Sequence, residues 1–203
     1  MSSEYVLPTK IFLLELRKKL RLVDFSKRIL EKKRDSLQSA IKKTIEEMKE
    51  VILFLKRELI ELMKFVLATA IVYGRSLRIY ALIQKGKLKI SVRYISERGI
   101  LVPVFEVEEF PELKDRFPEG IRALAKKLKL SIPDILRLAS IFVKIELLLR
   151  ELEVTNRIVN TLDKVVIPSL KEKISYVLSM LSEFFIAELS SLRVLITGVG
   201  EGL

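Results

Sequence analysis

The feature that most constrains the fold is a run of apolar residues, at alternating steps of three and four, near the start of the chain. A mean spacing near 3.5 places these side chains on one seam of an α-helix, as a left-handed coiled coil requires. No Pro or Gly lies between Thr9 and Tyr73, so this helix is predicted to run for about 65 residues, on the order of 100 Å. Consecutive steps of four at Leu37, Ile41 and Ile45 predict a stutter in the supercoil. The seam residues are Leu13, Leu16, Leu20, Val23, Leu30, Leu37, Ile41, Ile45, Met48, Ile52, Leu55, Leu59, Leu62 and Val66.

A helix of this length cannot bury its seam within itself, and the sequence contains a second helix of similar length. Ser131 and Asp134 resemble a capping box that starts it, and it is predicted to end near Leu195. Two such helices should fold back as an antiparallel pair, which would bring Leu16 close to Leu189. The second seam consists of Leu138, Phe142, Ile145, Leu149, Leu152, Val159, Leu162, Val166, Leu170, Ile174, Val177, Leu181 and Phe184.

The segment between the two helices has a different period. Leu88–Ser96 alternates apolar with polar residues, Glu97–Gly99 is a turn signal, and Ile100–Val107 is rich in strand-forming residues. These patterns predict a β-hairpin. An isolated two-stranded hairpin is marginally stable, so it should pack on a helix or on a partner protein. Pro103 predicts that the second strand is an edge strand or is bulged.

The fold class that follows is mostly α, a long antiparallel two-helix coiled coil with a small central head. The head should contain the β-hairpin, at about residues 88–107, and short helices that begin near Pro111 and Pro118. The N-terminal helix is assigned to residues 1–75, the head to 76–130, and the C-terminal helix with a short tail to 131–203, all in one structural unit.

The composition excludes several kinds of chemistry. The 203 residues include no Cys and no His, so the chain lacks a thiolate nucleophile and the commonest general base and metal ligand. It has no glycine-rich phosphate loop, and its longest uncharged runs, about ten residues, are too short to span a membrane. The net charge of +11 suggests an acidic partner, a nucleic acid or an anionic membrane surface. We therefore expect a soluble intracellular protein with no evident active site, and we assign it no catalytic, cofactor-binding or metal-binding residues.

Polar residues interrupt both predicted seams. Lys27 and Arg34 occupy positions of the first seam, where their stems could lie along the seam with the charges in water. They could instead control register or contact a neighbouring protein. Asn156 and Asn160 interrupt the second seam, where a buried Asn fixes register or faces a bound partner. Pro168 inside this helix predicts a kink, at a cost of roughly 3 kcal/mol if uncompensated.

Three motifs occur in a characteristic order along the chain. They are Pro8-Thr9-Lys10, then Ile29-Leu30-Glu31-Lys32-Lys33-Arg34-Asp35-Ser36-Leu37, and then Thr155-Asn156-Arg157-Ile158-Val159-Asn160-Thr161-Leu162-Asp163-Lys164-Val165-Val166-Ile167-Pro168-Ser169-Leu170. With these motifs the chain resembles the D subunits of the archaeal A-type and V-type rotary ATPases. The resemblance spans the chain, and the third motif is the most specific. Ile158, Thr161 and Asp163 stand where the family pattern has Arg, Ala and Glu.

The resemblance implies a non-catalytic central-stalk rotor of an A/V-type ATP synthase or ATPase. Such a rotor transmits torque between the membrane rotor ring and the catalytic hexamer, and couples ATP synthesis or hydrolysis to proton or sodium transport. The implied partners are the catalytic A and regulatory B subunits of the hexamer, together with the F and C subunits of the stalk. No cofactor, nucleic acid or direct membrane span is implied. The implied location is the cytoplasmic side of the cell membrane, as a peripheral protein.

In this family context, candidate contacts with other subunits lie on both long helices. Four basic residues near the N-terminal end of the first helix are expected to meet acidic loops of the surrounding ring, and we call them the basic collar. They are Arg17, Lys18, Lys19 and Arg21. The other candidates are Lys33, Arg34, Asp35, Asn156, Arg157, Asn160 and Pro168.

Two alternatives from other functional classes also fit the residue patterns. One is a coiled-coil chaperone or scaffold of the prefoldin type, which a stable self-oligomer would favour. The other is a nucleic-acid binder that uses the basic first helix, which steep salt dependence of binding would support. Against the second, Lys32–Asp35 has no interleaved aromatic residues and is expected to be a solvated face.

Overall fold

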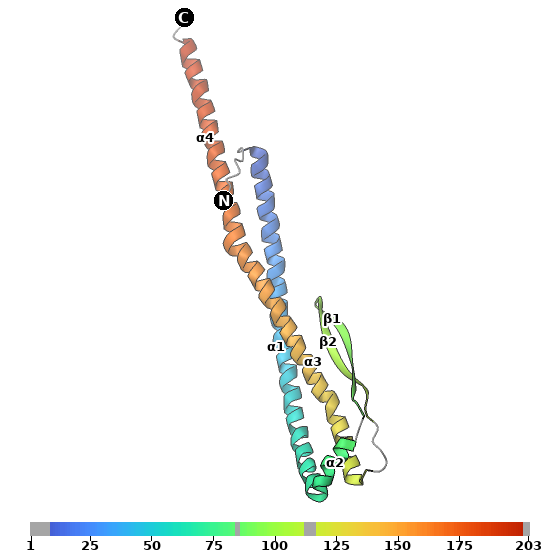
Figure 1. Ribbon diagram of the computed structural model, residues 1–203. Helices are drawn as coiled ribbons and strands as arrows, with labels where there is room; N and C mark the ends of the chain where they lie inside the picture. Colours follow the sequence, from blue (N-terminus) through green and yellow to red (C-terminus); the bar gives the residue numbers. More distant parts are fainter. Residues whose placement is uncertain (1–8, 84–85, 112–116, 201–203) are drawn as a thin grey trace. The chain divides into compact units, whose positions relative to one another are not determined.

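The computed structural model describes residues 9–83, 86–111 and 117–200. It divides into a terminal unit, Met1–Asp35 with Glu153–Leu203, and a central unit, Ser36–Leu152. The elements in chain order are α1 (Lys10–Tyr73), α2 (Arg75–Ile83), β1 (Lys89–Glu97), β2 (Ile100–Glu109), α3 (Glu119–Thr161), the π-helix η1 (Leu162–Val166) and α4 (Ile167–Gly200). Long helices at both ends of the chain and a two-stranded hairpin between them confirm the predicted fold class (Figure 1).

The first helix, α1, begins and ends at the expected local signals. The Thr9 hydroxyl accepts a hydrogen bond from the backbone N–H of Phe12 at 3.1 Å, which pairs one of the free donors of the first turn. Gly74 has a φ of 51°, a left-handed conformation that commonly follows a helix, and its N–H donates to the Ala70 carbonyl at 2.8 Å. The 64 residues between these caps form one α-helix, which confirms the predicted unbroken helix.

The buried side of α1 keeps a regular spacing, so the predicted stutter is wrong. Thr44 is 2% exposed and Val51 is 8% exposed, whereas Ile52 is 39% exposed. Steps of three and four therefore continue through Thr44 and Val51, where the prediction had Ile45 and Ile52. Thr44 tolerates burial because its hydroxyl donates to the Ala40 carbonyl at 2.9 Å, which leaves no hydroxyl unpaired.

On α3, three of the predicted seam residues are wrong by one position. The buried residues are Ile141, Leu148 and Thr155, in place of Phe142, Leu149 and Asn156. Phe142 is 58% exposed and Leu149 is 49% exposed. Two of the three pairs are apolar at both positions, so the spacing was compatible with either choice. Packing against α1 decides which residue of each pair is buried, namely Ile141, Leu148 and Thr155.

The core of the central unit shows the predicted antiparallel pairing. Leu37 and Ile41 of α1 cluster with Leu148 of α3, while Leu55, further along α1, clusters with Ile141. Later residues of α1 thus meet earlier residues of α3. The apolar seams of the two helices bury each other, which neither helix could do alone.

The hairpin of β1 and β2 is antiparallel and has a two-residue turn. Arg98 and Gly99 have φ values of 55° and 81°, and positive φ at both positions is what a type I′ turn requires. Both strands are edge strands of a two-stranded sheet, as predicted for the strand that contains Pro103. The bulge lies between Lys89 and Ile90, away from the proline.

The start of the second long helix differs from the prediction. The capping box at Ser131 and Asp134 is wrong, because α3 already begins at Glu119 and includes Pro133. The Ser131 hydroxyl donates to the Lys127 carbonyl at 3.4 Å, so it bonds to the turn before it. A proline inside a helix removes one backbone donor and crowds the carbonyl four residues earlier. The helix nevertheless continues through Pro133, because apolar residues on either side, such as Leu124 and Leu138, still pack.

The short helices expected in the head have different outcomes. The helix expected from Pro118 is the first part of α3. The helix expected from Pro111 falls largely on residues 112–116, which lie outside the described residues.

In the terminal unit, the first part of α1 packs against α4. Leu13 and Leu16 form a core cluster with Val177, so the predicted proximity of Leu16 to Leu189 is wrong. The reason is the length of α4, which continues beyond Val177 to Gly200, whereas α1 begins at Lys10. The last turns of α4 therefore have no neighbour from α1.

Candidate functional site

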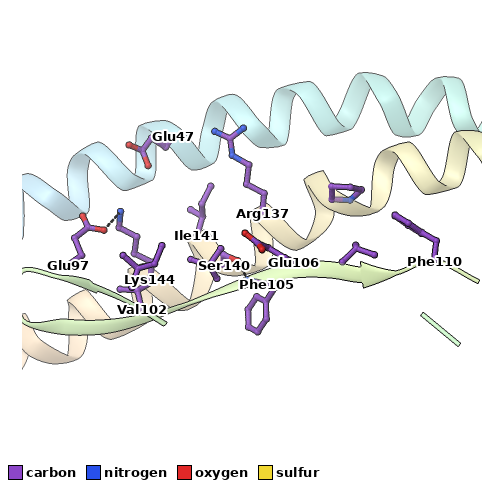
Figure 2. A pocket seen from close by; sticks show the side chains of 14 residues that line it. Glu47, Glu97, Val102, Phe105, Glu106, Phe110, Arg137, Ser140, Ile141 and Lys144 are labelled. Atoms are coloured by element: carbon purple, nitrogen blue, oxygen red, sulfur yellow. Dashed lines mark hydrogen bonds and ion pairs between the residues drawn. The ribbon is translucent and has the colours of Figure 1, made fainter. Parts of the chain in front are cut away.

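One side of the hairpin is apolar and points away from α3. Side chains alternate along a strand, so the paired register places one set on the side away from α3, which we call the outer hairpin face. Tyr94 is 67% exposed and Leu101 is 64% exposed, and Figure 2 shows the Phe105 ring directed away from α3. The apolar residues of the outer hairpin face are Ile90, Val92, Tyr94, Leu101, Pro103, Phe105 and Val107. Ser96 lies on the same side, opposite Leu101, and Glu109 continues the alternation of β2 beyond Val107.

The opposite side of the hairpin is fixed on α3 by apolar and polar contacts. Val102 is 5% exposed. The backbone N–H of Phe105 donates to the Ser140 hydroxyl at 2.9 Å, and Lys144 pairs with Glu97 at 2.7 Å (Figure 2). These contacts hold the strands in one orientation. The exposed apolar face is therefore a consequence of a defined packing arrangement.

A groove of about 660 Å³ lies between β2, α3 and α1 (Figure 2). Its lining is mainly apolar and includes Val102, Phe110 and Ile141. Its charged residues do not form a metal site, since the described part of the chain contains no group of three or more His, Cys, Asp or Glu side chains suited to a metal ion. The groove thus offers a mainly apolar surface for contact with another molecule.

Sequence reasoning did not identify the outer hairpin face as a site. The signal was present in β2, where Leu101, Phe105 and Val107 alternate with the equally apolar Ile100 and Val102. A strand that is apolar on both faces is typical of one that is covered on both faces. In this chain α3 covers only one of them.

The basic collar lies on α1, within the terminal unit. All four side chains, Arg17, Lys18, Lys19 and Arg21, are exposed. Across the described ranges, none of the four forms an ion pair. Their charges are therefore available to an acidic surface.

The other candidates also lie in the terminal unit, where the structure brings two groups to one level. Lys33, Arg34 and Asp35 are on α1, and Asn156, Arg157 and Asn160 are on α3. Lys27 of α1 meets Asp163, and the two helices run antiparallel. Seven residues, or about two turns, along each helix from this pair lie Arg34 and Asn156, so these two residues are at the same level. Arg34 pairs with Asp35 at 3.2 Å, and Asn156 is half-buried while Asn160 is exposed. Pro168 is the second residue of α4.

The structure pairs Lys27 with Asp163, which the sequence patterns do not predict. Lys27 occupies a seam position of α1 and Asp163 departs from the family pattern, and neither feature points to the other. The hydrogen bond from Lys27, reinforced by its charge, holds the pKa of Asp163 below its usual value. The same hydrogen bond raises the pKa of Lys27. The pair connects α1 to the π turn that precedes Pro168.

The end of α4 exposes a second group of apolar side chains. It lies beyond the contact of Val177 with Leu13 and Leu16. The exposed fractions of its large apolar residues range from 49% for Leu192 to 62% for Ile186. The group, which we call the α4 tip, consists of Phe184, Phe185, Ile186, Leu189 and Leu192. Among the described helices, none is long and apolar enough to cross a membrane.

Comparison with known proteins gives a match over nearly the whole chain. The family described as the D subunits of ATP synthase matches residues 12–195. The D subunit of the A-type ATP synthase of Saccharolobus islandicus is 28% identical over 207 residues, which cover 95% of this chain and 93% of the relative. That of Sulfolobus acidocaldarius is 28% identical over 189 residues, 90% of each chain. The D subunit of the V-type ATP synthase of Acetivibrio thermocellus is 29% identical over 197 residues, 90% of this chain and 86% of the relative.

Proposed function

The chain belongs to the family of ATP synthase D subunits, and on this premise we propose that it is the central-stalk rotor of an A/V-type ATP synthase or ATPase. In this role it transmits torque between the membrane rotor ring and the catalytic hexamer. It thereby couples ATP synthesis or hydrolysis to proton or sodium transport, without a catalytic site of its own. The observation that carries the proposal is the family match over residues 12–195, on a chain whose long helices pair antiparallel. This match favours the rotor over a prefoldin-type scaffold or a nucleic-acid binder.

Paired helices suit such a role because bending one helix requires its seam to move against the other. The α4 tip and the basic collar are the surfaces we assign to the hexamer of A and B subunits. The apolar α4 tip can rotate against an apolar surface of the hexamer without breaking hydrogen bonds or ion pairs. The outer hairpin face is assigned to another protein of the complex, and the F and C subunits complete the stalk. The assembly would sit at the cytoplasmic side of the membrane, with this chain as a peripheral component.

The first test concerns where ATP is hydrolysed. The purified chain alone is expected to show no ATP turnover, since its sequence contains neither His, Cys nor a phosphate loop. A complex recovered through a tag on this chain should contain the A, B, F and C subunits and should hydrolyse ATP. Phosphate release measured on both samples checks this. Turnover by the isolated chain, or a tagged chain that recovers no other component of an ATPase, would contradict the proposal.

The second test concerns the basic collar. Replacing Arg17, Lys18, Lys19 and Arg21 together with Gln should lower ATP turnover of the reconstituted complex by about tenfold. Four exposed ion pairs, each worth under about 1 kcal/mol, can together supply an effect of that size. A matched control replaces four exposed lysines of α1 in the central unit with Gln: Lys42, Lys43, Lys49 and Lys56. Circular dichroism should show both variants folded. Equal turnover of the collar variant and the wild type would mean that the collar does not contact the ring.

A further inference from the structure

The helices α3, η1 and α4 follow one another without a break, and we call them together the second arm. Its buried seam shifts by one residue within the terminal unit. Through α3 the seam proceeds in steps of three and four, ending with Thr155, 2% exposed, and Val159, 4% exposed. A regular continuation would place Val166 in the seam. The next buried residue is instead Ile167, 7% exposed, and the seam then proceeds through Leu170, Ile174, Val177 and Leu181. The sequence thus carries one residue more than a regular seam requires.

The π turn η1 lies where this extra residue must be accommodated. The backbone N–H of Ile167 donates to the carbonyl of Leu162, five residues back, instead of four as in an α-helix. A turn of this kind contains one additional residue, so α4 can present the shifted seam to α1. The irregular turn is therefore required by the side-chain packing on both sides of it.

Pro168 lies two residues after the π turn and favours the same irregularity. In an α-helix its ring would clash with the carbonyl of Lys164, and the bond to that carbonyl would be missing. A wider turn moves the carbonyl away from the ring. Two sequence features, the extra residue and the proline, therefore weaken the backbone hydrogen bonding of one short segment.

The pair of Lys27 and Asp163 holds this weak segment against α1. Asp163 belongs to the π turn, and the Lys27 side chain is 24% exposed at a seam position of α1. The raised pKa of Lys27 and the lowered pKa of Asp163 agree with a pair that favours both charged forms.

We propose that the π turn Leu162–Val166 is a hinge in the terminal unit, held by the Lys27–Asp163 pair, at which α4 changes its bend and rotation relative to α1. A shift of the seam by one residue corresponds to about 1.5 Å along the helix and roughly 100° around it. A small change of backbone geometry at the π turn therefore produces a larger displacement of the side chains further along α4. This hinge is a property of the chain itself and does not depend on the rotor assignment.

Amide hydrogen exchange of the full-length chain, followed by mass spectrometry, tests the hinge. Peptides covering residues 160–170 are expected to exchange at least about tenfold faster than peptides covering 138–152. Asp163→Asn, which keeps the size of the side chain and removes its charge, should speed exchange in 160–170 severalfold and leave 138–152 unchanged. Glu172→Gln removes one exposed carboxylate nearby and should change neither peptide. Equal exchange of the two regions in the wild type, or no effect of Asp163→Asn, would overturn the proposal.

A deletion separates the extra residue from other causes of flexibility. Both deletions below are made together with Pro168→Ala, because the proline ring would clash in a regular α-helix. Removing Val165, which is 60% exposed, brings Val159 and Ile167 to the regular spacing. The second arm should then be α-helical through this region, with exchange in 160–170 slowed by about tenfold and a higher Tm. Removing Val154, 49% exposed in the regular part of α3, should instead lower the Tm, because it breaks the step from Leu152 to Thr155. If deletion of Val165 lowers the Tm as much as deletion of Val154, the extra residue is not what the π turn accommodates.

Discussion

Replacing Leu148 with Ala will lower the free energy of unfolding by about 2–5 kcal/mol, the range found when a buried Leu is truncated in a packed core. Leu148 is 1% exposed and clusters with Leu37 and Ile41 across the helix pair. The cavity left by Ala would lie between two helices whose backbones are held by contacts on either side, so it cannot collapse freely. Urea denaturation followed by circular dichroism at 222 nm measures the loss.

The neighbouring residue supplies the control for this measurement. Leu149 is 49% exposed, so Leu149→Ala removes the same atoms from a surface position and should cost less than about 1 kcal/mol. Both variants keep the high helix propensity of the site. If Leu149→Ala destabilises the chain as much as Leu148→Ala, the seam of α3 has been assigned one residue too early.

Placing charges on the outer hairpin face is expected to abolish binding of the protein that covers it. In the double variant Tyr94→Asp with Leu101→Asp, two exposed apolar side chains become carboxylates, which a partner would have to bury without a counter-charge. Two such contacts, at about 2 kcal/mol or more each, correspond to a loss of affinity of roughly 1,000-fold or more. The Tm of the isolated chain should change little, because both side chains are more than 60% exposed. The measurement is recovery of each component of the ATPase with the tagged chain.

A matched variant tests whether added negative charge alone is responsible. Gln38→Asp with Ser39→Asp adds the same two charges at exposed positions of α1 in the central unit. It should recover the same components as the wild type. Full recovery of every component by the Tyr94 and Leu101 double variant would show that no partner covers the outer hairpin face.

Much of the helical architecture follows from local sequence signals. The absence of Pro and Gly between Thr9 and Tyr73, with a capping side chain at one end and Gly74 at the other, determines α1 almost completely. The alternating strand pattern and the Arg98–Gly99 turn determine the hairpin in the same way. Helix ends and tight turns are controlled by backbone geometry within a few residues, so they can be predicted without knowing what packs against them.

For the motif residues of the candidate site, local sequence signals predict less. The sequence order of Arg34, Asp35, Asn156 and Asn160 identifies the family, and their positions on two helices follow from the periodicity. That the two groups lie level with each other depends on the alignment of one helix against the other, which the pair of Lys27 with Asp163 reveals. Alignment between distant segments is a property of the packed pair, and neither segment contains it alone.

Only the tertiary structure decided which of several apolar surfaces is buried. Ile141 and Phe142 are both apolar, as are Leu148 and Leu149, so the helical period is satisfied by either residue of each pair, and contact with α1 chooses the first. β2 is apolar on both faces, and α3 covers one of them and leaves Leu101 exposed. The π turn arises in the same way, because it depends on the difference in register between the seams of α3 and α4. The sequence by itself determined α1 and the hairpin turn, since the hydrogen bonds of a helix and of a tight turn join residues that are close in the chain. The tertiary structure decided which faces meet, because apolar burial depends on the total surface removed from water.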